Sequence, residues 1–157
     1  MNSKFNPLSV KELVTKINKI PRIYLAQLPT ALEYAPNISK ELNINLYIKR
    51  DDCTALAFGG NKTRHLEFIM AKTLSGEYDC ILTGAASQSN FCRQAVAAAN
   101  KLNLDSYLVL MHGIKGKLMQ GNFLLYSILG ANVEVVEGEN LEEIPTHLDR
   151  KYKELIK

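Results

Sequence analysis

The chain has 157 residues, of which 46% are hydrophobic and 22% are charged. This is the composition of an ordinary globular protein, long enough to form one hydrophobic core. The formal net charge of +3 is spread along the sequence without a run of basic residues, which argues against nucleic acid or an anionic membrane as a partner. No apolar stretch approaches the roughly 20 residues that span a bilayer, and the N-terminus has no signal-peptide pattern. We therefore expect a cytoplasmic protein.

The cysteines and histidines do not suggest a metal site. Cys53, Cys80 and Cys92 form no C-x-x-C pair, and the three histidines lie far apart in the sequence. Cys80 falls on a predicted buried strand and Cys92 on a predicted helix, so both are interpreted as small apolar core residues. Unpaired cysteines of this kind suggest a reducing compartment.

The N-terminal third of the chain begins with a helix signal. Ser9 followed by Glu12 has the form of a capping box, which predicts a helix over residues 9–19 that ends before Pro21. The next predicted elements are an extended arm over residues 21–36, a helix over 37–42 and a strand over 45–49.

The remainder of the sequence has a regular pattern. Short apolar runs at residues 80–83, 107–111 and 133–136 alternate with segments of helical spacing, which predicts a βαβαβ unit with a parallel sheet. Residues 121–130 are apolar almost throughout and predict a helix buried on more than one side. A last helix is expected from about residue 141, with an apolar stripe that needs a surface to cover. It contains Ile144, Leu148, Tyr152 and Leu155.

The predicted fold class is α/β, a three-layer, doubly wound parallel sheet that is incomplete. We expect residues 1–45, the N-terminal helix and extended arm, to belong to a large domain. Residues 46–157 are expected to form the βαβαβ core of a small domain with its terminal helix.

A glycine pair, Gly59-Gly60, leads into the predicted helix that contains Lys62. Glycines allow a positive φ and a close approach of the backbone to a ligand, and Asn61 is expected to cap the helix by accepting from its first free amides. The loop is not a nucleoside-triphosphate loop, which needs glycine directly before the lysine. Helical spacing places Lys62 on one stripe with the residues expected to face the core. These are Leu66, Ile69, Met70 and Thr73.

Two interpretations of Lys62 remain open on spacing alone. The side chain can extend along the surface and bring its ammonium to solvent. Alternatively, desolvation beside the positive end of the helix dipole favours the neutral amine, a nucleophile that forms Schiff bases with aldehyde cofactors.

A second polar segment follows the strand predicted at residues 80–83. Residues 84–90 form a loop of mostly small residues that ends in Gln-Ser-Asn. The free amides at the start of the following helix form a natural site for an anion. Ser89 can either cap this helix or contact a ligand, and both interpretations stay open. Since Lys62 and Ser89 each follow a strand of what could be one sheet, we expect them to lie near each other at one edge.

With these motifs assembled, the sequence resembles the D-cysteine desulfhydrase and 1-aminocyclopropane-1-carboxylate deaminase family of pyridoxal-phosphate enzymes, which have the tryptophan synthase β-like fold, or fold type II. The Gly-Gly-Asn-Lys-Thr-Arg and Gln-Ser-Asn sequences separate this family from the serine and threonine dehydratases. The resemblance covers nearly the whole chain. Its motifs, in order, lie at residues 28–33, 47–52, 59–67, 88–94 and 121–131.

The resemblance implies a set of functional residues. Lys62 would form a Schiff base with pyridoxal 5'-phosphate and move the α-proton of the substrate, and Ser89 would be the second catalytic residue. Asn90 and Asn61 would bind the cofactor, Asn90 through the cofactor's 3'-oxygen. The backbone amides of Ser89, Asn90 and Phe91 would bind the substrate carboxylate. In this sequence Phe91 stands where the family commonly has histidine, and Ala85 where it usually has glycine.

The implied activity is a lyase or deaminase reaction on a small amino acid. Elimination from D-cysteine would give a 2-oxoacid, ammonia and sulfide, and 1-aminocyclopropane-1-carboxylate is the alternative substrate. Family members are longer, and no second glycine-rich turn follows Val136, so the chain is expected to correspond to the N-terminal half, with little activity alone and a homodimer when full-length. The remaining alternative is a catalytically incompetent α/β module that binds a small anion or a protein.

Overall fold

The computed structural model describes residues 7–112, 118–138 and 140–156. Short 3-10 helices cover Asp51–Cys53 and Leu141–Glu143. The α-helices are α1 (Val10–Ile17), α2 (Pro36–Leu42), α3 (Lys62–Ser75), α4 (Asn90–Lys101), α5 (Gly121–Ile128) and α6 (Ile144–Leu155). The strands are β1 (Leu32–Tyr34), β2 (Tyr47–Lys49), β3 (Cys80–Ala86), β4 (Asp105–Met111) and β5 (Asn132–Val136).

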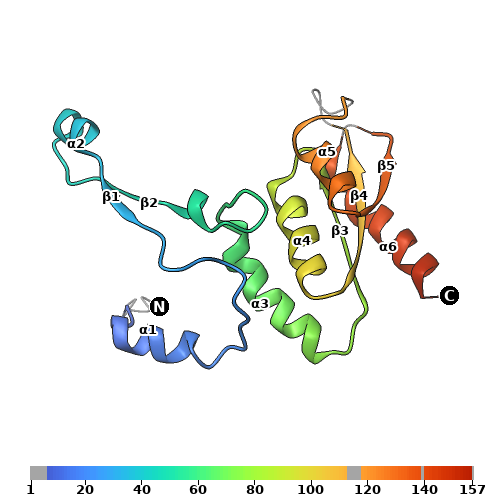
Figure 1. The fold of residues 1–157 in the computed structure, drawn as a ribbon, viewed down its shortest axis with the longest axis horizontal. Coiled ribbons are helices and arrows are strands. Elements are labelled where there is room, and N and C mark those ends of the chain that lie inside the picture. Colours follow the sequence, from blue (N-terminus) through green and yellow to red (C-terminus); the bar gives the residue numbers. More distant parts are fainter. Residues whose placement is uncertain (1–6, 113–117, 139, 157) are drawn as a thin grey trace, which may run out of the picture.

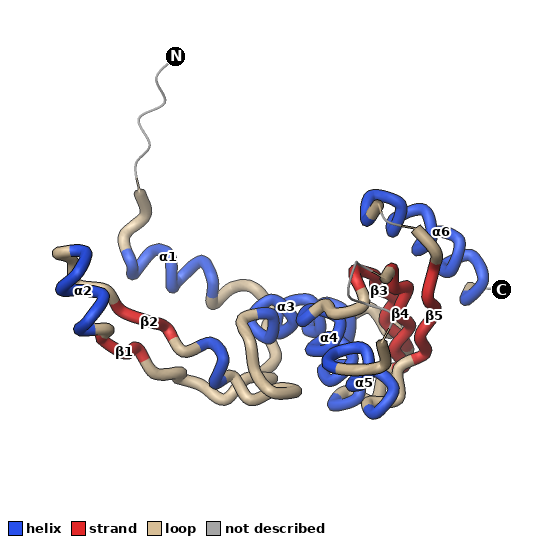
Figure 2. Tube along the Cα trace, turned by 90° about the horizontal axis from the view of Figure 1, so that it is seen from above, coloured by secondary structure: helices blue, strands red, loops and turns tan. Residues whose placement is uncertain are grey.

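A three-stranded parallel sheet forms the centre of the C-terminal part of the chain. Its strands lie in the order β3-β4-β5, with Cys80 paired to Asp105 and Tyr107 paired to Asn132. Figure 2 shows α6 on one side of this sheet and α4 and α5 on the other, while α3 packs against α4. The α/β architecture with a parallel sheet between helical layers is therefore confirmed.

The segment between α1 and α3 forms a separate two-stranded sheet. β1 and β2 pair antiparallel, with Leu32 opposite Lys49, and together with α2 they extend away from the parallel sheet (Figure 1). The expectation that the strand before Lys62 could belong to the same sheet as the strand before Ser89 was wrong, because β2 pairs only with β1 among the described strands. The division into residues 1–45 and 46–157 stays a prediction, and the paired strands β1 and β2 lie on either side of it.

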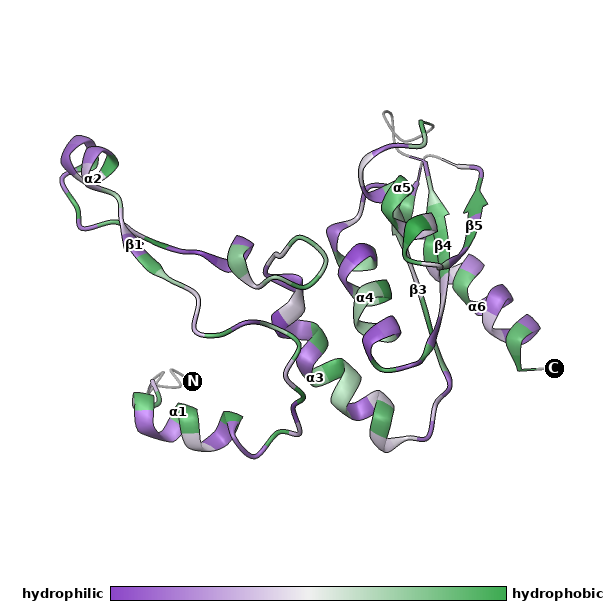
Figure 3. Cartoon of the chain, viewed as in Figure 1, coloured by the Kyte–Doolittle hydropathy of each residue, from purple (hydrophilic) through white to green (hydrophobic). Residues whose placement is uncertain are grey.

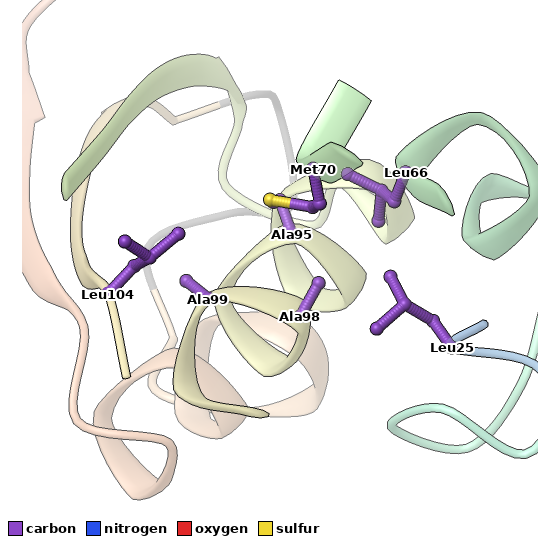
Figure 4. Close-up of a cluster of buried hydrophobic side chains, with 7 residues drawn as sticks. All are labelled: Leu25, Leu66, Met70, Ala95, Ala98, Ala99 and Leu104. Atoms are coloured by element: carbon purple, nitrogen blue, oxygen red, sulfur yellow. The ribbon is translucent and has the colours of Figure 1, made fainter. Parts of the chain in front are cut away.

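Three clusters of buried apolar side chains hold the layers together. The first lies between α3 and α4, where alanines on α4 let the two helices approach closely and Leu25 of the N-terminal arm closes one side (Figure 4). The second lies between α4, α5 and β4, and it includes Cys92, which is fully buried as predicted. The third lies under α6. Cys80, the other cysteine predicted in the core, is only half-buried.

Helix α1 has the predicted cap, but none of its side chains is buried in a core. Ser9 Oγ accepts from the Glu12 amide at 3.3 Å and the Ser9 amide donates to the Glu12 carboxylate at 2.9 Å, so the capping box is confirmed. No residue of α1 is buried, although hydrophobic and hydrophilic residues alternate along it in Figure 3. The cap therefore defines where the helix starts, while its apolar face is solvent-exposed in this structure.

Helix α5 departs from its prediction. Phe123 and Tyr126 are buried against α4 and the sheet, but Leu124 and Ile128 are 40% and 68% exposed. The expectation of burial on more than one side was wrong, because the described residues cover only one face of the helix.

Helix α6 covers the sheet only at its start. Ile144 is buried, and both Ile144 and Leu148 pack against the sheet, where a side chain on Gly84 would collide with Ile144. Tyr152, further along the predicted stripe, is 55% exposed. The stripe therefore contacts the sheet over its first turns alone.

A buried carboxylate fastens the N-terminal arm to α3. The side chain of Glu67 is inaccessible to solvent and accepts hydrogen bonds from the amides of Leu25 and Ala26, each at 3.0 Å, and from Arg22 Nε at 2.8 Å. The Ile23 amide adds a bond to the Glu67 carbonyl. Burial alone would raise the pKa of the Glu67 carboxyl, but the two amides and the guanidinium together hold this pKa below its ordinary value.

This contact predicts a pH-dependent loss of stability. We expect Glu67→Gln to lower the free energy of unfolding at pH 7 by about 2 kcal/mol, because it removes a buried charge-assisted pair and leaves Arg22 without its carboxylate. Since the pKa of Glu67 is lower in the folded than in the unfolded chain, its stabilisation is complete above the ordinary value of 4.5 and is lost as the pH falls through the folded value. Urea unfolding across this range should show the two proteins converging in acid.

The matched control is Glu41→Gln, at an exposed position of α2 whose side chain makes no hydrogen bond or ion pair within the described part of the chain. It should leave the unfolding free energy nearly unchanged. A Glu67→Gln variant as stable as this control at pH 7 would show that the arm does not depend on the carboxylate.

Candidate functional site

Lys62 is the first residue of α3 and is half-buried. Among the described residues, its ammonium makes no hydrogen bond and no ion pair. The predicted stripe is confirmed at Leu66 and Met70, which are buried, and wrong at Ile69, which is 47% exposed; the buried face instead includes Thr63 and Glu67. Lys62 therefore lies at the border of the buried face, with its amine unpaired.

The glycine pair before Lys62 makes the predicted turn. Gly59 and Gly60 have φ values of 74° and 131°, which side-chain-bearing residues rarely adopt. A Cβ on Gly59 would lie 1.8 Å from the Asp52 carbonyl oxygen, and one on Gly60 would lie 2.4 Å from the Gln94 side chain. Glycine is therefore required at these two positions because the backbone lies close to other parts of the protein, whereas the sequence suggested a close approach to a ligand.

Asn61 does not cap α3. It has a helical backbone conformation, with φ of −64° and ψ of −17°, and its side chain makes no capping hydrogen bond. An N-cap residue normally has an extended backbone, which directs its side chain toward the first-turn amides. The acceptor comes instead from α4, where Gln94 Oε1 accepts from the Thr63 amide at 2.7 Å. The expected capping role of Asn61 was wrong, and the role of Gln94 was not predicted.

The start of α4 has a side-chain N-cap, one of the two roles considered for Ser89. Ser89 Oγ accepts from the Cys92 amide at 3.3 Å, so Ser89 caps this helix. The Ser89 amide donates to the Ala86 carbonyl at 2.9 Å and is already used. Within the described residues, the amides of Asn90 and Phe91 make no hydrogen bond. The side chain of Phe91 packs against the first apolar cluster.

The loop before α4 is fixed by α5. Asn122 donates from its side chain to the Gln88 carbonyl at 2.7 Å and to Asn90 Oδ1 at 2.9 Å, and its own amide donates to Gln88 Oε1. The Tyr126 hydroxyl donates to the Ser89 carbonyl at 2.9 Å. Burial raises the pKa of this hydroxyl, so it remains a neutral donor. Asn122 and Tyr126 both lie in the motif at residues 121–131, but the sequence predicted a role for neither of them.

The two segments are brought together by helix packing and not by a common sheet. α3 and α4 lie side by side (Figure 1), and Gln94 joins the start of α3 to the first turns of α4. The resulting region contains an unpaired primary amine, a serine hydroxyl and free backbone amides at the start of α4. This set can bind a carbonyl carbon covalently and an anion by hydrogen bonds.

Other kinds of site find no support in the described part of the chain. It contains no group of three or more His, Cys, Asp or Glu side chains that could hold a metal ion. None of its helices has the length and apolar character to cross a bilayer. Concave surfaces lie along α6, beside Tyr78 and at α2, and these contain neither Lys62 nor Ser89.

Comparisons with known proteins agree with this chemistry. The family described as "Pyridoxal-phosphate dependent enzyme" matches residues 23–156. A protein of Klebsiella pneumoniae named "D-cysteine desulfhydrase" is 39% identical over 142 residues, which cover 85% of this chain and 43% of that protein. The chain therefore spans less than half the length of this relative.

Solved structures give the same result. The structure titled "Crystal Structure Analysis of the ACC deaminase homologue" has a TM-score of 0.84 and 36% identity, and the match covers 94% of this chain and 44% of that one. The apo form of Escherichia coli diaminopropionate ammonia lyase has a TM-score of 0.65 at 14% identity, which is a likeness of fold alone. The described fold is therefore that of fold type II enzymes, and the family match over most of the sequence shows that this chain belongs to the pyridoxal-phosphate dependent enzymes.

Proposed function

We propose that this chain carries the amine and the substrate-binding helix of a cytoplasmic pyridoxal-phosphate dependent lyase or deaminase for a small amino acid, with little activity by itself. The observation that carries the proposal is the half-buried, unpaired amine of Lys62 on a helix joined by Gln94 to the helix that Ser89 caps. The backbone of an ordinary surface lysine is not held against a second helix in this way.

The residues present fit the cofactor. An aldehyde needs an amine that is not held in an ion pair, and Lys62 has no such partner among the described residues. The oxygen on the cofactor ring needs a hydrogen-bonding side chain. Asn90, the first residue of α4, is exposed, and a hydrogen bond from Asn122 fixes the orientation of its side chain. When bound, pyridoxal phosphate would supply an aldehyde for covalent attachment and a ring that accepts electrons from the substrate α-carbon.

Each residue of the chain then has a separate task. Lys62 would hold the cofactor and, once released by the substrate amine, accept the α-proton at Nζ. The cap of α4 uses Ser89 Oγ as an acceptor, which leaves the hydroxyl hydrogen to be donated near the substrate. The free amides of Asn90 and Phe91, at the positive end of α4, would bind the substrate carboxylate.

D-cysteine is the first candidate substrate. Breaking the Cα–H and Cβ–S bonds would release sulfide, and hydrolysis of the remaining enamine would give a 2-oxoacid and ammonia. A relative named "D-cysteine desulfhydrase" at 39% identity supports this choice. The solved homologue whose title names ACC deaminase, at 36% identity, supports the second candidate, 1-aminocyclopropane-1-carboxylate.

The first test concerns Lys62. We expect pyridoxal phosphate mixed with the chain to give a visible absorbance band and, after borohydride reduction, a covalent label on Lys62 that mass spectrometry locates. Lys62→Ala should abolish the band and the label, because it removes the only amine at the start of α3. Lys72→Ala, on the exposed side of the same helix, should change neither. Equal labelling of Lys62 and Lys72 would show that Lys62 is no more reactive than an exposed lysine, and it would favour an α/β module that binds an anion.

The second test separates capping by Ser89 from ligand contact. Ser89→Ala should lower the unfolding free energy by about 1 kcal/mol, because it removes the N-cap, while Ser89→Asn keeps a capping oxygen and should be close to wild type. Both variants should need a higher concentration of D-cysteine to change the spectrum of the cofactor-loaded chain, because neither has the hydroxyl.

The same titration with 1-aminocyclopropane-1-carboxylate distinguishes the two candidate substrates. The amino acid that changes the spectrum at the lower concentration is the better ligand. A Ser89→Asn chain that matches wild type in both stability and titration would show that Ser89 is only a cap.

A further inference from the structure

We propose that Gln94 is a positioning residue, which sets where Lys62 lies relative to the Ser89 cap. This proposal rests on the proposed function, since it concerns the placement of the amine that would bind the cofactor. Gln94 itself need not touch substrate or cofactor.

Gln94 holds both ends of the segment that contains Lys62. Its Oε1 accepts from the Thr63 amide at 2.7 Å and from Thr63 Oγ1 at 2.6 Å. Its Nε2 donates to the Gly59 carbonyl at 3.1 Å. Lys62 lies between these two attachment points, so its backbone cannot shift without breaking a buried hydrogen bond.

The Gln94 amide is buried and lies close to the backbone of Gly60. The Gln94 side chain has no solvent exposure, and Gly60 leaves only enough room for its Nε2. The Gly59 carbonyl also accepts from Arg93 Nη2 at 3.0 Å. A buried polar side chain whose bonds all go to one short segment defines a single geometry for that segment, because water cannot replace the lost partners.

Gln94 also connects Lys62 to Ser89 through a rigid element. Both Gln94 and Ser89 belong to the same helix start, where five residues of α-helix rise by about 7.5 Å. Ser89 is fixed by its bond to the Cys92 amide. Holding Thr63 and Gly59 against Gln94 therefore fixes the start of α3, and with it Lys62, against the capped end of α4.

The test compares labelling of Lys62 in variants of the 157-residue chain. Gln94→Met has a similar volume but neither donor nor acceptor, and Gln94→Glu keeps the acceptor for Thr63 alone. Val109→Ala, a buried change in the cluster under α6 on the opposite face of the sheet, controls for general loss of stability. Each chain is labelled with pyridoxal phosphate, reduced and digested, and the label on Lys62 is expressed relative to that on Lys72. Amide exchange at Thr63 is followed by NMR without cofactor.

We expect Gln94→Met to lower the Lys62-to-Lys72 label ratio by about fivefold, the factor that corresponds to roughly one net hydrogen bond. Exchange of the Thr63 amide should accelerate by about tenfold, because this amide loses its buried acceptor. Gln94→Glu should recover part of the ratio, and Val109→Ala should leave it unchanged.

Three results would overturn the proposal. Faster exchange at Thr63 with an unchanged label ratio would show that Gln94 is structural only. An equal fall of the ratio in Val109→Ala would assign the effect to stability in general. A wild-type chain without preference for Lys62 over Lys72 would refute the proposed function, and the positioning role with it, whatever the exchange at Thr63 shows.

Discussion

The packing of α3 against α4 determines the rest of this structure. Ala95, Ala98 and Ala99 leave one face of α4 nearly flat, so Leu66 and Met70 of α3 can lie directly on it. A larger residue at any of these alanines would push α3 outward and break the bonds that Gln94 makes to the loop before Lys62. The apolar contact thus decides whether the polar contacts can form, and the polar contacts fix the position of the amine.

Two buried polar side chains then fix how the neighbouring segments are placed around this apolar contact. Glu67 on α3 accepts amides from the N-terminal arm, and Gln94 on α4 accepts an amide from the first turn of α3. Each takes up backbone donors that would otherwise be buried without a partner, which costs more than a net hydrogen bond contributes. Hydrophobic burial alone would tolerate sliding between the helices, whereas these bonds are satisfied in one register only.

The sequence predicted the elements and the family better than the contacts between them. The β-strands and helices from residue 80 onward follow the hydrophobic periodicity of the sequence. Ser9 was recognised as a cap, and capping was one of the two interpretations of Ser89, because in both cases the bonded amide lies three residues further along the chain. The capping of α3 was misassigned to Asn61 because its true partner, Gln94, is distant in sequence and no local pattern specifies it. A polar residue next to an alanine run on a predicted buried face was the available signal. The burial of Glu67 was missed for the same reason, since charge alone predicts exposure.

The strained loop before Lys62 shows how these contacts act together. Ala55, Ala57 and Phe58 all have positive φ values, a conformation that costs L-residues roughly 1 kcal/mol or more each. The loop is held by the bonds of Thr54 to Gly60 and by those of Gln94 and Arg93 to Gly59, each worth about 1 kcal/mol net. Strain and hydrogen bonding are thus of similar size, and the loop keeps this conformation only while its partners on α4 stay in place. Any change that separates α4 from the loop would release the strain and move the start of α3, so the position of Lys62 depends on side chains that lie outside its own helix.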